Sequence, residues 1–196
     1  MSQYKTQDIR NVAIVGHAGS GKTLLAEALL HRAGAIAERG ELTRGTTVCD
    51  FDPQERAMQH SINVAMCHLD YNGHRINLLD TPGHEDFSED TYRTLTAADS
   101  AIMVLDAAKG IEPQTRKLFE VCRQRGVPIF TFMNKCDRPM KNPLELLDEL
   151  ERASDPNVTE LSGPLIEVLQ DQRVPLLPDQ IGEGLERNRS PRLCEG

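Results

Sequence analysis

Short apolar runs alternate with amphipathic stretches between residues 11 and 152 of the chain. The apolar runs have the length of buried strands, and the first of them ends in a glycine, as a parallel strand often does before a turn. The stretches between them repeat Leu and Ala at helical spacing. This pattern predicts strands at 11–16, 61–69, 74–80, 101–106 and 127–133, and helices at 22–32, 88–98, 112–124 and 143–152.

Two of the predicted strands are joined by Tyr71-Asn72-Gly73. Asn-Gly between two apolar runs is a strong signal for an antiparallel hairpin. The other strands alternate with helices, which favours parallel pairing. We therefore expect an α/β domain whose sheet is mostly parallel, with one antiparallel edge hairpin and helices on both faces.

Two segments carry no such pattern. Residues 34–60 lack clean periodicity and include Pro53. A loop of this length inside a domain is usually functional or disordered. From about Ala153 onward, prolines and glycines interrupt the sequence. We expect one domain over residues 1–152, followed by a tail over 153–196 whose fold the sequence specifies poorly.

Composition narrows the classes of protein to which the chain can belong. Its net charge of −8, from 30 acidic and 22 basic residues, argues against a protein that coats nucleic acid by bulk electrostatics. Its five cysteines are scattered without a C-x-x-C pair, which is typical of a reducing compartment. No apolar stretch approaches the ~18 residues needed to cross a membrane. These features predict a soluble cytoplasmic protein without direct contact to DNA or to a membrane.

The first predicted strand runs into a glycine-rich octet that opens the first helix. In a G-x-x-x-x-G-K-[S/T] loop, backbone N–H groups approach phosphate oxygens, the lysine reaches the β- and γ-phosphates, and the last hydroxyl can bind Mg²⁺. The helix that follows directs its positive N-terminal dipole at the same anion. The sequence thus predicts a phosphate-binding loop formed by Gly16, His17, Ala18, Gly19, Ser20, Gly21, Lys22 and Thr23.

The run Asp80-Thr81-Pro82-Gly83-His84 follows another predicted strand. Asp80 ends that strand at its carboxyl side, where ligands collect in α/β sheets. We expect Asp80 to hold Mg²⁺ through water, and the Gly83 N–H to face a γ-phosphate. His84 would then lie beside that phosphate and orient a water molecule. Downstream of a phosphate-binding loop, this run predicts a switch that senses the terminal phosphate.

Asn134-Lys135-Cys136-Asp137 follows the last predicted strand and is expected at the same edge of the sheet. The Asp137 carboxylate can accept hydrogen bonds from N1–H and the exocyclic amine of guanine, whereas adenine offers the wrong pattern. The wrong base would leave buried polar groups without hydrogen-bond partners, and this cost makes the discrimination between guanine and adenine large. Lys135 is expected to pack its stem against the base and the phosphate loop. With Asn134, these residues predict GTP and GDP as ligands, with Mg²⁺ as the cation.

In these motifs and around them, the chain resembles the translational GTPases. The segment from about residue 85 to residue 151 resembles the peptide chain release factor 3 family, notably in the runs EDFSEDTYRTLTA and TFMNKCDRP. Residues 1–60, with DIRNVAIVGHAGSGKT and GTTVCDFDP, are more similar to the elongation factor G family. The resemblance covers about three quarters of the chain and implies a P-loop NTPase G domain.

The chain departs from the family pattern at several positions. Gly19 stands where these families commonly carry Asp, and residues 58–62 read MQHSI in place of the usual Arg-Gly-Ile-Thr-Ile run. In that run Ser61 still offers a hydroxyl to Mg²⁺. A fifth family motif, whose backbone contacts the guanine oxygen, has no match after Asp137. Residues 173–184 are faintly similar to the start of an inserted subdomain, and the ribosome-binding domains of these factors are not in the sequence.

Together, the residues and the resemblance predict a domain that binds GTP·Mg²⁺ and hydrolyses the γ-phosphate by in-line attack of water. Lys22 and the loop amides would stabilise the charge, and His84 would position the water. Thr23, Ser61 and Asp80 would serve the metal. Because no arginine is clearly placed as an internal finger, turnover without a partner is expected to be slow. The resemblance implies the ribosome as activator and class I release factors as partners, in translation termination.

Three alternatives remain open at this point. One is a translocation factor of the elongation factor G kind. Another is a truncated module that binds guanine nucleotide without ribosomal activity, which the missing fifth motif and the expected absence of later domains favour. The intact motif residues oppose it, namely Lys22, Thr23, Asp80 and His84. The third is an ATP-using P-loop enzyme, which the run 134–137 disfavours.

Overall fold

The computed structural model describes residues 4–50, 52–58, 61–84, 86 and 88–154. The tail expected over 153–196 lies outside the described residues from position 155 onward. None of the described helices is both long and apolar enough to cross a membrane.

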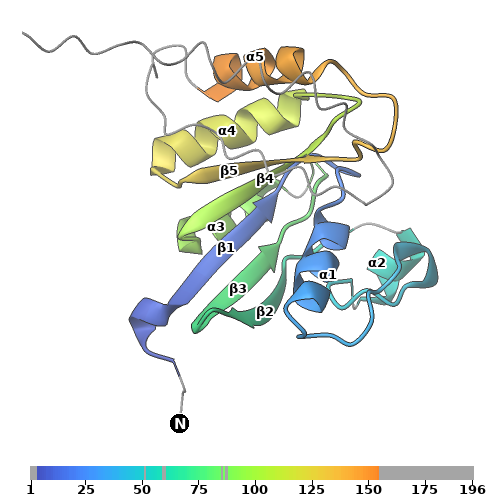
Figure 1. Cartoon of the computed structure of the whole chain (residues 1–196), viewed down its shortest axis with the longest axis vertical. Coiled ribbons are helices and arrows are strands. Elements are labelled where there is room, and N and C mark those ends of the chain that lie inside the picture. Colours follow the sequence, from blue (N-terminus) through green and yellow to red (C-terminus); the bar gives the residue numbers. More distant parts are fainter. Residues whose placement is uncertain (1–3, 51, 59–60, 85, 87, 155–196) are drawn as a thin grey trace, which may run out of the picture.

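Five strands form one sheet in the order β2-β3-β1-β4-β5 (Figure 1). Strands β3, β1, β4 and β5 pair in parallel, whereas β2 runs antiparallel to β3 at one edge. This arrangement confirms the predicted α/β fold with one antiparallel edge hairpin. The strands are β1 (Ile9–Val15), β2 (Ala65–Tyr71), β3 (His74–Asp80), β4 (Ser100–Asp106) and β5 (Ile129–Asn134).

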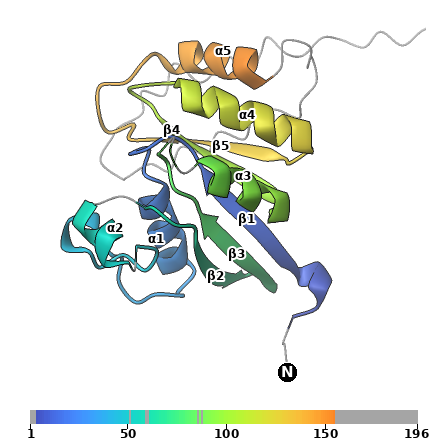
Figure 2. The ribbon, with the colours of Figure 1, turned by 180° about the vertical axis from the view of Figure 1, so that it is seen from behind.

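Helices cover both faces of this sheet. Helix α1 lies in front of the sheet in Figure 1, whereas α3 lies behind it, and the opposite view in Figure 2 reverses the two. Helices α4 and α5 pack on the same face as α3. The helices are α1 (Lys22–Arg32), the short α2 (Pro53–Met58), α3 (Ser88–Ala97), α4 (Pro113–Arg125) and α5 (Pro143–Ser154), with single 3₁₀ turns at Thr6–Asp8 and Leu42–Arg44.

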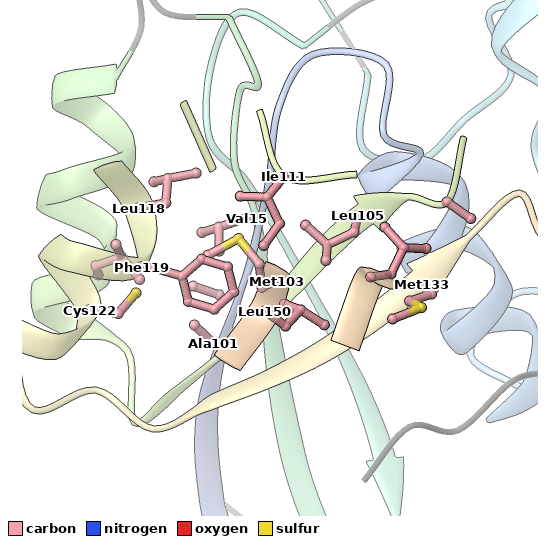
Figure 3. Close-up of a cluster of buried hydrophobic side chains, with 14 residues drawn as sticks. Val15, Ala101, Met103, Leu105, Ile111, Leu118, Phe119, Cys122, Met133 and Leu150 are labelled. Atoms are coloured by element: carbon pink, nitrogen blue, oxygen red, sulfur yellow. The ribbon is translucent and has the colours of Figure 1, made fainter. Parts of the chain in front are cut away.

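Alternation along the central strands divides the core into two layers. Met103 and Leu105 of β4 face α4 and α5, where Phe119 packs on them (Figure 3). Ile14 of β1 and Val104 of β4 point to the opposite face, against α1. Apart from Phe119, the buried members of the first cluster are aliphatic or contain sulfur, as expected for a chain with few aromatic residues. This two-sided burial holds the carboxyl ends of the strands at one rigid edge.

The hairpin turn has the predicted geometry. Asn72 and Gly73 both have positive φ, at 49° and 79°, which is the signature of a type I′ turn. Strand β2 begins at Ala65 rather than at the predicted residue 61. The reason is that the N–H groups of Ile62 and Asn63 are bound by the Glu55 carboxylate and are therefore not available to the sheet.

Candidate nucleotide-binding site

The carboxyl ends of β1, β3, β4 and β5 bring the predicted phosphate-loop, switch and base-reading motifs together. The loop after β1 makes direct contact with the segments after β3 and β5. A Cβ placed on Gly83 would lie 2.8 Å from the backbone N and Cα of Ala18, and one on Gly21 would meet Asn134 Nδ2. Gly83 is required by the close backbone of Ala18, and Gly21 by its φ of 101°. The three segments therefore form one site at the edge where α/β sheets collect ligands.

Lys22 is the buried cation at the centre of this site. Its Nζ donates to the carbonyl oxygens of Gly16 (3.1 Å) and His17 (3.0 Å), inside the turn of the phosphate loop. Burial lowers the pKa of Lys22 to about 8, although the carboxylates of Asp80 and Asp50 oppose that shift. A desolvated ammonium beside the N-terminus of α1 is a strong attractor for an anion.

Two hydroxyls and two carboxylates meet next to Lys22. Thr23 Oγ1 donates to Asp80 Oδ2 at 2.8 Å and lies 3.2 Å from Ser61 Oγ. Ser61 Oγ in turn donates to Asp50 Oδ1 at 2.8 Å. The predicted metal residues Thr23, Ser61 and Asp80 thus come together, although Ser61 is 38 positions from Thr23. Asp50 completes the group and was missed in the sequence, because it lies in the segment without periodicity.

The donor set fits Mg²⁺. Burial raises the pKa of Asp80 to about 6, and in the described part of the chain its Oδ1 atom has no hydrogen-bond partner. Mg²⁺ prefers oxygen ligands and is usually bound by one or two carboxylates together with substrate phosphates and water. No cluster of three or more His, Cys, Asp or Glu side chains suited to a metal is found among the described residues.

Two buried glutamates hold the long loop against the site. Glu27 on α1 accepts hydrogen bonds from the Gly40 N–H (2.9 Å) and the Val48 N–H (2.5 Å). Glu55 on α2 accepts from Ile62 and Asn63 at 2.9 Å each, and from Asp52 at 3.3 Å. These acids place Asp50 and Ser61 beside Thr23. Their role was not visible in the sequence, where the one signal was Glu27 within the otherwise apolar part of the predicted helix at 22–32.

The base-reading segment is fastened to the phosphate loop. Asn134 Nδ2 donates to Ser20 O at 2.8 Å, and Lys135 Nζ donates to Gly19 O at 2.6 Å. Lys135 Nζ also donates to Asp106 Oδ2 at 2.7 Å. Burial by itself raises the pKa of Asp106, but the hydrogen bonds from Lys135 and the Ala108 N–H lower it overall. Asp137 leaves its carboxylate exposed, with Arg138 Nε at 4.0 Å, and so available to a ligand.

His84 lines a cavity of about 380 Å³. Its side chain is half exposed, and its Nδ1 lies 3.2 Å from Asp86 Oδ2. Ala18 and Gly83 line the same cavity, together with His17 and the beginning of α4. His17 Nδ1 lies 2.8 Å from Glu112 Oε2, and burial lowers the pKa of this histidine. His84 thus borders the same cavity as Ala18 of the phosphate loop.

This combination of a parallel sheet, a phosphate loop, a switch aspartate and an N-K-x-D segment defines a P-loop domain of the GTP-binding class. The chain belongs to the elongation factor Tu GTP-binding domain family, whose sequence model matches residues 7–180.

Similar proteins refine this assignment. The chain is 56% identical over 149 residues to peptide chain release factor 3 of Rippkaea orientalis, a match that covers 73% of the chain and 27% of that protein. It is 52% identical over 162 residues to peptide chain release factor 3 of Gloeothece citriformis, covering 80% of the chain and 30% of that protein. Both matches are longer than the segment 85–151 on which the release-factor resemblance was based. The chain spans less than a third of the length of these relatives.

A solved structure from Thermus thermophilus has the same fold. Its TM-score is 0.70 at 38% sequence identity, and the match covers 74% of this chain and 22% of that protein. This agreement supports the overall fold of the chain.

Proposed function

We propose that this chain is the GTP-binding and GTP-hydrolysing domain of a ribosome-associated translation factor of the release factor 3 type. The observation that supports it best is the convergence of Thr23, Ser61 and Asp80 beside the buried Lys22. This is the donor set that a nucleotide phosphate and Mg²⁺ require. The names of the relatives support the release-factor assignment.

The residues present divide the work of hydrolysis among them. Thr23 and Ser61 would hold Mg²⁺ through their hydroxyls, and Asp80 and Asp50 would hold it through water. The bound ion supplies charge neutralisation at the β- and γ-phosphates. Lys22 and the loop N–H groups bind the phosphate oxygens, and the Gly83 N–H holds the γ-phosphate. His84 orients the attacking water in line, so that the bond between the γ-phosphorus and the β-γ bridging oxygen breaks and GDP leaves.

Guanine selection depends on the exposed Asp137 carboxylate. It accepts hydrogen bonds from N1–H and the exocyclic amine of guanine, neither of which adenine can supply in the same place. Asn134 and Lys135 keep that segment at a fixed distance from the phosphate loop through Ser20 and Gly19. A ligand is therefore recognised at its base and at its phosphates at once.

The wider assignment follows from the same family. In this proposal the GTP-binding domain covers residues 1–152, and the ribosome is its activator. Class I release factors are the partners, and the factor serves their recycling in the cytoplasm. Action in translocation, as in the elongation factor G kind, is the alternative. A binding-only module is disfavoured because Lys22, Thr23 and Asp80 are all in place.

Binding of fluorescent GDP with Mg²⁺, competed by GTP and by ATP, tests this proposal. We expect GTP to displace the probe and ATP not to, and Asp137→Asn to abolish binding. Asp148→Asn, an exposed position on α5, is the matched control and should bind as the wild type does. Equal displacement by ATP and GTP would refute guanine selection.

A second measurement addresses the chemistry. His84→Ala should leave GDP affinity unchanged and reduce ribosome-stimulated hydrolysis by about 100-fold or more, the usual contribution of a positioned proton-handling group. His31→Ala, an exposed change on α1, serves as the control. Equal rates for wild type and His84→Ala would remove His84 from the mechanism.

A further inference from the structure

Two cysteines lie face to face between the long loop and the sheet edge. Cys49 Sγ and Cys67 Sγ are 3.6 Å apart. Cys49 directly precedes Asp50 in the loop, whereas Cys67 belongs to the edge strand β2. Both are free thiols, and a disulfide bond of about 2.05 Å needs only a small approach of the two sulfur atoms from this arrangement.

One of the two thiols is accessible from a cavity. A cavity of about 470 Å³ opens between the end of α1 and the outer strand β2. Cys67 lines it, along with Val48, Ile36 and Met66. Cys49 is buried and is not among the residues that line this cavity. A small oxidant in this cavity therefore meets Cys67 first.

The contact with Cys49 also favours the reactive, ionised form of the Cys67 thiol. The hydrogen bond from the Cys49 thiol lowers the pKa of Cys67, although burial opposes that shift. Thiolate character is what makes a cysteine nucleophilic. Cys122 differs in this respect, because burial raises its pKa to about 11.

We propose that Cys49 and Cys67 are an oxidation site at which a peroxide converts the two thiols into a disulfide that ties the Asp50 loop to β2. The Cys67 thiolate attacks one peroxide oxygen, the O–O bond breaks, and a sulfenic acid and water form. The Cys49 sulfur then attacks the Cys67 sulfur, the S–O bond breaks, and the oxygen leaves as water with the thiol proton. Two thiols and one hydrogen peroxide thus give one disulfide and two waters.

Peptide mapping tests the pairing directly. The full chain, carrying Cys194→Ser in every sample, is treated with hydrogen peroxide, alkylated and digested with trypsin. Cleavage after Arg44, Arg56 and Arg75 places Cys49 in peptide 45–56 and Cys67 in peptide 57–75. We expect these two peptides to appear covalently linked and to separate on reduction with dithiothreitol. Oxidation of Cys122 or Cys136 at the same rate as Cys67, or absence of the linked pair, would overturn the proposal.

Variants distinguish the attacking thiol from the resolving one. In Cys49→Ser the sulfenic acid at Cys67 should persist and be trapped by dimedone. In Cys67→Ser, Cys49 should remain reduced. Cys122→Ser, a buried cysteine outside the pair, should leave the yield of the linked peptides unchanged. Rapid dimedone labelling of Cys49 in Cys67→Ser would contradict the assigned order.

A consequence for the nucleotide site rests on the proposed function. Because Asp50 holds Ser61 beside Thr23, a tether at Cys49 should slow release of fluorescent GDP from the oxidised wild type and leave Cys67→Ser unaffected by peroxide. Equal release rates in the oxidised and reduced wild type would overturn this link. The linked peptides form whether or not the chain binds GDP, so the two failures are distinguishable.

Discussion

Burial disfavours the charged forms of two ionisable residues in the site. Lys22 and Asp80 are both shifted toward their neutral forms by burial, Lys22 downward and Asp80 upward in pKa. Each is therefore more costly to bury as a charge than to leave in water. A phosphate beside Lys22 and a cation beside Asp80 would relieve both costs, and we therefore expect the site to prefer these ligands.

Replacing Asp80 should stabilise the nucleotide-free domain at neutral pH. Its pKa is raised from 3.8 to about 6, so its favourable contribution to folding is complete below pH 3.8 and is lost as pH rises through 6. The ionised carboxylate then costs up to about 3 kcal/mol at pH 7. We expect the stability difference between Asp80→Asn and wild type to grow by up to that amount between pH 4 and pH 7.

Urea unfolding without nucleotide or Mg²⁺ at both pH values measures this difference. Asp148→Asn, at an exposed position, should show no such change with pH. Parallel stability profiles for wild type and Asp80→Asn would contradict the buried, ionised state of Asp80.

At the scale of elements, the short helix α2 acts as a clamp. A six-residue helix is too short to be stable alone, and it is held by the surrounding structure. Its Glu55 carboxylate uses one oxygen for the Ile62 and Asn63 N–H groups and the other for the Asp52 N–H. The clamp thereby fixes the position of Ser61, which lies next to Ile62 in the chain.

Glu55→Gln should loosen this clamp. Glutamine offers one acceptor oxygen where glutamate offers two. Either the N–H groups of Ile62 and Asn63 or the N–H group of Asp52 therefore loses its acceptor. Hydrogen bonds to charged groups contribute about 1.5–3 kcal/mol each. We expect faster amide hydrogen exchange at Ile62 and Asn63 and weaker Mg²⁺-dependent GDP binding. The exposed Glu38→Gln is the control, and unchanged exchange in Glu55→Gln would argue against the clamp.

At the scale of the whole molecule, the site belongs to no single element. The phosphate loop, the switch and the base-reading segment follow three different strands and are joined by hydrogen bonds between distant residues, such as Asn134 to Ser20. The two core layers on either side of the sheet fix those strands relative to one another. Binding and global stability are therefore expected to be coupled.

GDP with Mg²⁺ should stabilise the entire domain against unfolding. A ligand that binds only the folded state adds about 2.7 kcal/mol at 100 times its dissociation constant. We expect urea unfolding to shift by this amount with Mg-GDP and not with Mg-ADP, and the shift to disappear in Asp137→Asn. An equal shift with Mg-ADP would show that phosphate binding alone accounts for the coupling.

The sequence by itself determined the types and order of the five strands and of the four longer helices, together with the local motifs. Apolar runs of strand length, helical spacing of Leu and Ala, and the Asn72-Gly73 turn are properties of adjacent residues, so they can be predicted without the fold. The same holds for the phosphate loop of Gly16–Thr23, because its chemistry needs a fixed short spacing.

Tertiary structure alone decided the contacts between segments far apart in the chain. Asp50 meets Ser61, Lys135 meets Asp106, and Cys49 meets Cys67. These contacts cannot be predicted from neighbouring residues, because they depend on how the strands pair and how the helices pack. Residues 34–50 and 52–58 show this most clearly, since the buried Glu27 and Glu55 carboxylates bind backbone N–H groups in or beside a segment for which the sequence pattern predicts no element.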